Sequence, residues 1–375
     1  MSHAFVKEDY LMIKKATIVL LSLSLMWTIG CGRGNVNDLE VARQELEERA
    51  YTQAEIRLEK FTEKQPENIE ALCLLAAAYN RQDKTQKLEA TASKLRGIGK
   101  PAMDKIVDII RNERSMAEDM VKVLTLVGDQ ATDTMVSALG DTADHVRENA
   151  VLVLTKIGTP TIGSLKKALD SSNAFIRSGS ARILGNMGDK TAIAPLVKTL
   201  KDTDPLVKLE SAIALHKLGD ESHVDIITDG LSSDLVSVRR ASAMAIRDMV
   251  EKPSVKSLLK AIKDSDIQVR VAVIQTLGKA KDAQAVSPLM EAIKSKDSDI
   301  RNAAGDALKE IGEPAVMPLV DLIKQEKDIA TLQKAIQALG DIGDKRAIEP
   351  LEKIYSESNQ SLVKQEAAVA LNKIE

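Results

Sequence analysis

The stretch His145-Val-Arg-Glu-Asn-Ala-Val-Leu-Val-Leu-Thr-Lys-Ile-Gly158 recurs in altered form along this chain about every thirty-one residues. Each copy has a β-branched residue, a base and small residues, and usually ends with a Leu seven places and a Gly eleven places after the base. The bases are Arg147, Arg177, Lys208, Arg239, Arg270, Arg301 and Lys364. A period in this range is typical of stacked helical units that share one extended core.

Each repeat is predicted to be a pair of helices joined by a short polar turn, because two apolar stretches at helical spacing alternate within the period. Aspartates in the turns suit N-caps of the second helix, and glycines at its end suit the C′ position, where a positive φ is needed. The aspartates include Asp204, Asp266 and Asp297, and the glycines are Gly158, Gly188, Gly219, Gly312 and Gly343. At two joints Val250 and Lys281 replace the glycine, so these joints are expected to bend differently.

Residues 38–98 contain helices of a different period. An apolar face formed by Tyr51, Ala54, Leu58 and Phe61 is followed by Gln65-Pro-Glu-Asn68, which is predicted to end this helix and cap the next. The segment resembles tetratricopeptide repeats, although the family's Trp and its Leu-Gly pair are missing and at most two repeats fit. The matching small, apolar, Pro and Tyr positions are Ala54, Leu58, Pro66, Leu72, Leu75, Ala76 and Tyr79.

Residues 99–375 are similar to HEAT-like repeats of the phycobilisome-lyase type, on the basis of the Val-Arg phrase and the small residues after it, such as Ala304, Gly305 and Ala307. The resemblance implies an all-α fold. We expect a right-handed α-solenoid of about nine HEAT-like helical pairs, preceded by a short tetratricopeptide-like helical segment. In arrays of this kind the second helices line the concave side, where a partner is held.

The N-terminal residues predict a targeting signal. A basic start and an apolar stretch over residues 16–29 precede Gly30 and Cys31, which resembles a bacterial lipoprotein signal with Thr28-Ile-Gly-Cys31 as its lipobox. The resemblance implies that residues 1–30 are removed, that Cys31 is lipidated, and that residues 31–37 are a linker. Met12 is the expected true start, because acidic residues precede it. The alternative is an uncleaved anchor helix, although a span needs about 20 apolar residues.

The same resemblance implies a location in the cell envelope, lipid-anchored and facing the periplasm or the cell exterior. Gly32, and not Asp, follows the lipobox Cys, which resembles an outer-membrane sorting signal where the organism has two membranes.

The repeated base has two interpretations. It could form an anion-binding ladder, or it could tie neighbouring repeats together through a turn Asp of an adjacent unit. We favour the structural role, which would fix register more than net stability, because partly buried ion pairs return little after desolvation. The residues concerned are Arg147, Arg177, Lys208, Arg239, Arg270 and Arg301.

Composition argues against several function classes. The net charge is -3, which provides no basic stripe for nucleic acid, and aromatic residues make up 2%, too few for stacking platforms. The four histidines include none followed by Glu, so the His-Glu metal pairs of the HEAT-like deoxyhypusine hydroxylase are absent, and there is no Cys-x-x-Cys pair. We therefore expect no metal, no cofactor and no catalytic residue. Cys73 lies in an apolar run and is expected to be a buried core residue.

A partner-binding surface is predicted from the positions one, five, eight and nine after the base, which point away from the core of their own pair. In the middle repeats these positions are Arg182, Leu209, Ile213, His216, Lys217, Arg240, Met244 and Arg247. The set mixes bases with apolar groups, so a partner segment that is apolar with some acidic residues is expected to lie across residues 177–250. The alternative is that Leu209, Ile213 and Met244 are half-buried between neighbouring helices.

The sequence thus favours a lipid-anchored protein-binding scaffold or adaptor of the bacterial cell envelope, with a protein or peptide partner, a membrane contact and no nucleic acid. The alternative is an accessory enzyme of the HEAT-repeat lyase or hydroxylase type that acts on a chromophore or a protein side chain.

Overall fold

The computed structural model describes residues 34–249 and 255–374, and within these ranges the chain is helical and has no β-strand. The predicted all-α solenoid class is confirmed. The chain divides into two compact units, one ending at Thr161 and the other beginning at Ile162. The predicted signal, Cys31 and Val250 lie outside the described residues. The division predicted at residue 98 concerns the type of repeat, and it stays a prediction.

The first unit holds four N-terminal helices and then two helical pairs. The four helices are α2 (Gly34–Glu47), α3 (Tyr51–Lys64), α4 (Ile69–Asn80) and α5 (Thr85–Ile98). The two pairs are α6 (Lys100–Asn112) with α7 (Ala117–Val127), and α8 (Thr132–Ala138) with α9 (Asp144–Ile157). Between α3 and α4 the predicted cap is present, because the Asn68 side chain accepts a hydrogen bond of 3.0 Å from the Ala71 backbone N–H.

The N-terminal helices bury the apolar face that their spacing predicts. Ala54 and Leu58 of α3 and Leu72 of α4 are fully buried. Cys73 is also fully buried and forms no disulfide, as expected for a small core residue. Burial raises the pKa of the Cys73 thiol to about 12, so the thiol stays protonated and unreactive at neutral pH.

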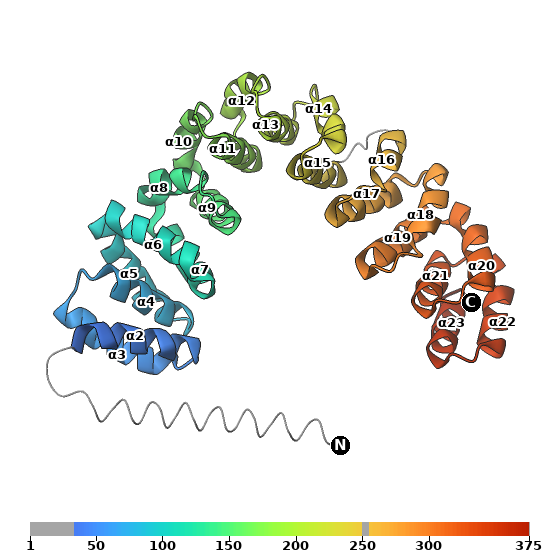
Figure 1. The fold of residues 1–375 in the computed structure, drawn as a ribbon, viewed down its shortest axis with the longest axis horizontal. Helices are drawn as coiled ribbons and strands as arrows, with labels where there is room; N and C mark the ends of the chain where they lie inside the picture. Colours follow the sequence, from blue (N-terminus) through green and yellow to red (C-terminus); the bar gives the residue numbers. More distant parts are fainter. Residues whose placement is uncertain (1–33, 250–254, 375) are drawn as a thin grey trace, which may run out of the picture. The chain divides into compact units, whose positions relative to one another are not determined.

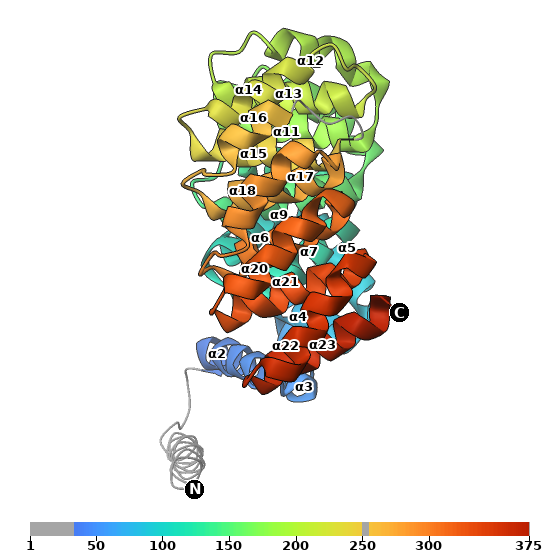
Figure 2. The ribbon, with the colours of Figure 1, turned by 90° about the vertical axis from the view of Figure 1, so that its right-hand side faces the viewer.

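The second unit continues with seven helical pairs (Figure 1), so the described residues hold the nine pairs that the repeat predicts. The first helices are α10 (Ile162–Ala168), α12 (Ile193–Thr199), α14 (Val224–Asp229), α16 (Val255–Ala261), α18 (Val286–Ala292), α20 (Val316–Gln325) and α22 (Ile348–Glu357). The second helices are α11 (Ala174–Met187), α13 (Pro205–Lys217), α15 (Val236–Asp248), α17 (Ile267–Ala280), α19 (Ser298–Ile311), α21 (Ile329–Ile342) and α23 (Ser361–Ile374). Within this unit the second helices form one row and the first helices another; Figure 2 shows α20 beside α21 and α22 beside α23.

The second helices begin and end where the sequence predicts. Asp204, Asp266 and Asp297 each accept backbone N–H bonds as N-caps of α13, α17 and α19. The five predicted glycines all have positive φ, between 71° and 92°. Lys281 also takes a positive φ, 52°, so the chain makes a left-handed turn there without glycine.

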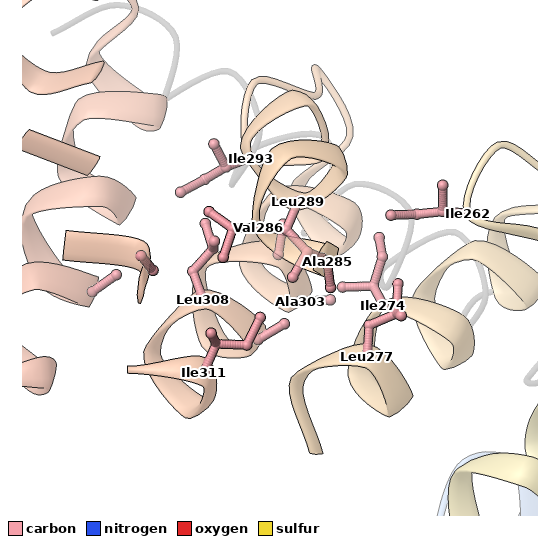
Figure 3. Packing of buried hydrophobic residues seen from close by; sticks show 14 of the residues in the cluster. Ile262, Ile274, Leu277, Ala285, Val286, Leu289, Ile293, Ala303, Leu308 and Ile311 are labelled. Carbon is pink, nitrogen blue, oxygen red and sulfur yellow. The ribbon is translucent and has the colours of Figure 1, made fainter. Parts of the chain in front are cut away.

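The core of the second unit lies between its two rows of helices (Figure 3). Ile274 and Leu277 of α17, Leu289 of α18 and Leu308 of α19 are fully buried and belong to one continuous cluster that runs from repeat to repeat. Each such side chain contributes roughly 1.5–3 kcal/mol of hydrophobic stabilisation relative to an exposed one. A repeat therefore depends on its neighbours for burial.

Glycines inside the second helices let some neighbours approach very closely. A Cβ on Gly185 would lie 2.5 Å from the Cα of Ala214, and a Cβ on Gly278 would lie 2.7 Å from the Cα of Ala307. These are backbone contacts that cannot swing aside. Small residues therefore let α11 approach α13 and α17 approach α19 closely.

Candidate partner-binding surface

The predicted surface residues lie on three consecutive second helices. Arg182 is on α11; Leu209, Ile213, His216 and Lys217 are on α13; and Arg240, Met244 and Arg247 are on α15. These helices occupy neighbouring places in one row, so the repeat does bring the three segments together.

The prediction that Leu209 and Ile213 are exposed is wrong. They are 1% and 7% exposed and belong to the core cluster that includes Val238 and Ile246 of α15. The positions one and five after the base point away from the core of their own pair, but they face the second helix of the next repeat. In this repeat the second helix of the next repeat covers Leu209 and Ile213. The alternative prediction, that these residues are buried between neighbouring helices, is therefore the one that holds.

Met244 is exposed, as predicted, with 49% of its surface accessible. Arg240 and Arg247 flank it at helical spacing, one turn to either side. The Arg240 guanidinium donates to Asp266, the N-cap of α17, and this contact lowers the pKa of the Asp266 carboxyl to about 2. Arg247 Nε donates to Asp248 at 2.9 Å.

Two lysines complete the surface. Lys217 Nζ donates to Asn186 Oδ1 at 2.7 Å, and Lys279 Nζ, on α17, donates to the Arg247 carbonyl at 3.3 Å. The hydrogen bond from Arg247, together with the charges of both lysines, holds the pKa of the Asp248 carboxyl below its usual range. We call Lys217, Arg240, Met244, Arg247 and Lys279 the Met244 surface. Among the described residues, Arg240 and Arg247 pair with the carboxylates of Asp266 and Asp248, whereas the two lysines donate to uncharged oxygen atoms.

Beside this surface lies a group of poorly satisfied polar side chains. Glu210 of α13 is 7% exposed and makes no hydrogen bond or ion pair among the described residues. Burial raises the pKa of its carboxyl, against the opposing charges of Arg182 and Lys217. Arg182 Nε and His216 Nδ1 are also buried without a hydrogen-bond partner in the described part of the chain. Arg182 therefore balances a buried acid, and its role differs from that of the exposed bases.

The repeated base first of all closes the turn of its own repeat. Nη1 of Arg147, Arg177, Arg239, Arg270 and Arg301 donates to the carbonyl oxygen six residues before the base, at distances between 2.6 and 2.9 Å. This contact within the repeat was not predicted. It ties the base to the polar turn that precedes the second helix.

The predicted tie between repeats is present at two bases. Arg177 Nε donates to Asp202 at 2.7 Å, and Arg239 Nε donates to Asp264 at 2.7 Å, in each case in the turn of the following repeat. Twenty-five residues after Lys208 and after Arg270, where Arg177 and Arg239 find an aspartate, the chain has a serine. Lys208 and Arg270 have no ion pair among the described residues. Lys208 makes no hydrogen bond there either, so its predicted role is not observed.

Three features were not predicted from the sequence: Glu210, Lys279 and a regular alternation of acidic residues and serines in the turns. Leu332 occupies the place of the base in one repeat. Six residues before the successive base positions, Leu332 included, stand Asp141, Ser171, Asp202, Ser233, Asp264, Ser295, Glu326 and Ser358. This regular alternation was readable in the sequence, and it accounts for the carboxylates that Arg177 and Arg239 find and for the serines that face Lys208 and Arg270.

No group of three His, Cys, Asp or Glu residues in the described ranges is arranged to hold a metal ion. Across residues 34–249 and 255–374, no helix is both long enough and apolar enough to span a membrane.

Comparison with protein families decides the class. Residues 162–247, 255–328 and 315–372, more than half of the chain, match the model for HEAT repeats. This chain belongs to the HEAT-repeat family. The matched repeats are the seven pairs of the second unit, in which the Met244 surface lies. No curated protein matches the chain closely enough to count as a relative.

Solved structures resemble this chain at low identity. A chain from the complex of Kap95p with RanGDP is 11% identical over 91% of this chain and 51% of its own length, with a TM-score of 0.50. YibA of Escherichia coli is 19% identical over 68% of this chain and 95% of its own, at 0.49. Human deoxyhypusine hydroxylase, in complex with glycerol, is 23% identical over 67% and 98%, at 0.30. Such likeness shows the fold alone.

Proposed function

We propose that this HEAT-repeat protein is a lipid-anchored adaptor of the bacterial cell envelope that holds a protein partner on its second-helix row. A stacked array presents a long continuous surface, which suits an extended protein partner better than a small substrate. The structure of Kap95p with RanGDP contains a similar chain in a protein complex, in keeping with this class of function.

The observation that carries the proposal is the exposed Met244 among bases. A methionine adapts its shape to an apolar partner, and surrounding arginines add polar contacts that fix orientation. Leu209 and Ile213 are buried, so they give the α13–α15 joint its stability and leave contact with the partner to the Met244 surface.

A pair of matched variants tests this role. Replacing Met244 and Arg247 together with Ala is expected to abolish co-purification of the partner and to leave helical content and thermal melting unchanged. The control is Met317→Ala, because Met317 is 46% exposed but lies on α20, in the row of first helices. Arg182 is left intact, since its removal would take away the larger of the two charges that oppose the buried Glu210 carboxyl. Undiminished co-purification with the double variant would move the binding surface elsewhere.

The envelope location rests on the lipobox resemblance of Thr28-Ile-Gly-Cys31. With Cys31→Ala, we expect the precursor mass to persist and the processed membrane-bound form to disappear on cell fractionation. An unchanged mature mass together with unchanged membrane retention would reject the lipid anchor, and it would leave the adaptor role to be judged by the Met244 variants.

A further inference from the structure

The position nine residues after the base forms a row of charged side chains along the second helices. Lys217 on α13, Asp248 on α15, Lys279 on α17 and Lys373 on α23 occupy this position. A lysine there reaches back to the preceding repeat, so the row links neighbours, as the Lys217–Asn186 contact shows.

The lysines of this row differ in what their ammonium groups meet. Lys373 Nζ donates to the Asp341 carboxylate at 2.6 Å, which neutralises its charge. Lys217 and Lys279 donate to uncharged oxygen atoms, an amide and a backbone carbonyl. Asp248 lies between these two lysines along the row but already pairs with Arg247. Among the described residues, two ammonium groups therefore lack a direct carboxylate partner, one repeat to either side of Met244.

We propose that the Met244 surface binds an extended acidic segment of the partner, with two carboxylates about six residues apart and an apolar side chain between them. This inference rests on the proposed function and adds the chemistry of the bound segment. The carboxylates pair with Lys217 and Lys279, and the apolar side chain lies on Met244.

The spacing follows from the packing of helices. Neighbouring helices lie about 8–10 Å apart, so second helices two repeats apart are separated by roughly 16–20 Å. An extended chain advances about 3.3–3.6 Å per residue, and five or six residues cover that span. Side chains alternate along an extended segment, so carboxylates six apart point to the same side.

The chemistry of the row favours a short acidic peptide over a long polyanion or an anionic membrane. After Lys279 the next residues at this position are Glu310 and Asp341, both exposed. A nucleic acid or a flat lipid surface that extends along the row would meet these acids, whereas a segment confined to α13, α15 and α17 does not. Met244 at the centre also requires an apolar contact, which a phosphate backbone does not supply.

The test uses the full chain in mild detergent and two fluorescent peptides of equal charge. One peptide carries two glutamates six residues apart with a leucine four residues after the first, so that all three side chains share one side, and the other carries the same residues with the glutamates two apart. The peptide with glutamates six apart is expected to bind about tenfold more tightly than the other peptide at low salt, and this difference in affinity should shrink at high salt. Replacing Lys217 and Lys279 with Ala should remove the preference, whereas Lys373→Ala should preserve it.

Two outcomes would overturn the inference: equal affinity for both peptides, or a preference that survives the double lysine variant. Binding to anionic vesicles that is lost in the same variant, with no peptide preference, would assign the surface to a membrane. If neither peptide is preferred but the partner is still captured through Met244, the acidic segment is rejected and the adaptor function is retained. Partner capture that is unchanged when Met244 and Arg247 are both replaced with Ala would instead count against the proposed adaptor surface, whatever the peptide results.

Discussion

At the scale of single residues, the glycines that end the second helices fall into two backbone classes. Gly343 has φ 74° and ψ 20°, the left-handed helical region, which Lys281 also occupies with φ 52° and ψ 29°. Gly312 has φ 81° and ψ −128°, a region that side chains hardly enter. At Gly312 and Gly343 an added Cβ meets nothing within 4 Å, so backbone conformation alone separates them.

These two glycines provide a matched pair of substitutions. Gly343→Ala should lower the free energy of unfolding by about 1 kcal/mol, and Gly312→Ala by roughly 2–3 kcal/mol, because only the first has an accessible left-handed well. Urea unfolding midpoints of both variants check the order. Equal losses would contradict the assignment of two classes.

At the scale of elements, the turn before each second helix decides how repeats are joined. The Asp264 carboxylate accepts from Arg239 of the preceding repeat, and its backbone carbonyl accepts from Arg270 of its own repeat. Ser295 occupies the equivalent place in the next repeat, where its hydroxyl accepts the Asp297 backbone N–H much as Asp264 accepts that of Asp266. An acid therefore fits the Ser295 position without a change of turn conformation.

We accordingly expect Ser295→Asp to add an ion pair with Arg270 and to stabilise the second unit by about 0.5–1 kcal/mol. The gain should vanish in the background Arg270→Ala, as a double-mutant cycle measures. A gain of the same size in both backgrounds would mean that the new carboxylate acts through the turn and not through Arg270.

The existing pair Arg177–Asp202 makes stability depend on pH. The Arg177 guanidinium holds the pKa of the Asp202 carboxyl below its ordinary value. A carboxyl with a depressed pKa in the folded state stabilises the fold above its unfolded pKa of about 4, and this stabilisation is lost as the pH falls through the folded pKa.

Asp202→Asn should therefore cost roughly 1–3 kcal/mol at pH 7, and this cost should diminish steadily below about pH 4. Asp170→Asn is the control, because Asp170 is exposed in the neighbouring turn and has no ion pair among the described residues. Unfolding measured from pH 7 to pH 2 separates the two; a cost that is constant with pH would argue against the ion pair.

Sequence patterns predicted the elements better than they predicted the contacts between repeats. Caps such as Asp204, and the glycine ends of helices, follow from local backbone chemistry, so residue type alone identifies them. The burial of Leu209 and Ile213 depends on where the next second helix lies, and periodicity within one repeat does not contain that information. The excess charge of Lys217 and Lys279 likewise depends on which atoms their neighbours offer.

At the scale of the whole molecule, a first unit of helices is followed by a second unit built of HEAT repeats. A row of charges along such an array can select a partner by the spacing of the partner's own charges, because neighbouring helices hold the charges of the array about 10 Å apart. In this account the Met244 surface supplies specificity, and the remaining repeats set its position and stability.

The central claim is that a protein partner contacts the second-helix row at Met244. The most direct measurement is to place a photo-crosslinking amino acid at position 244 in living cells, with position 317 on α20 as the matched site in the other row. The account predicts a discrete crosslinked protein band from position 244 and none from position 317. Crosslinks of equal yield at both positions, or at position 317 alone, would contradict it.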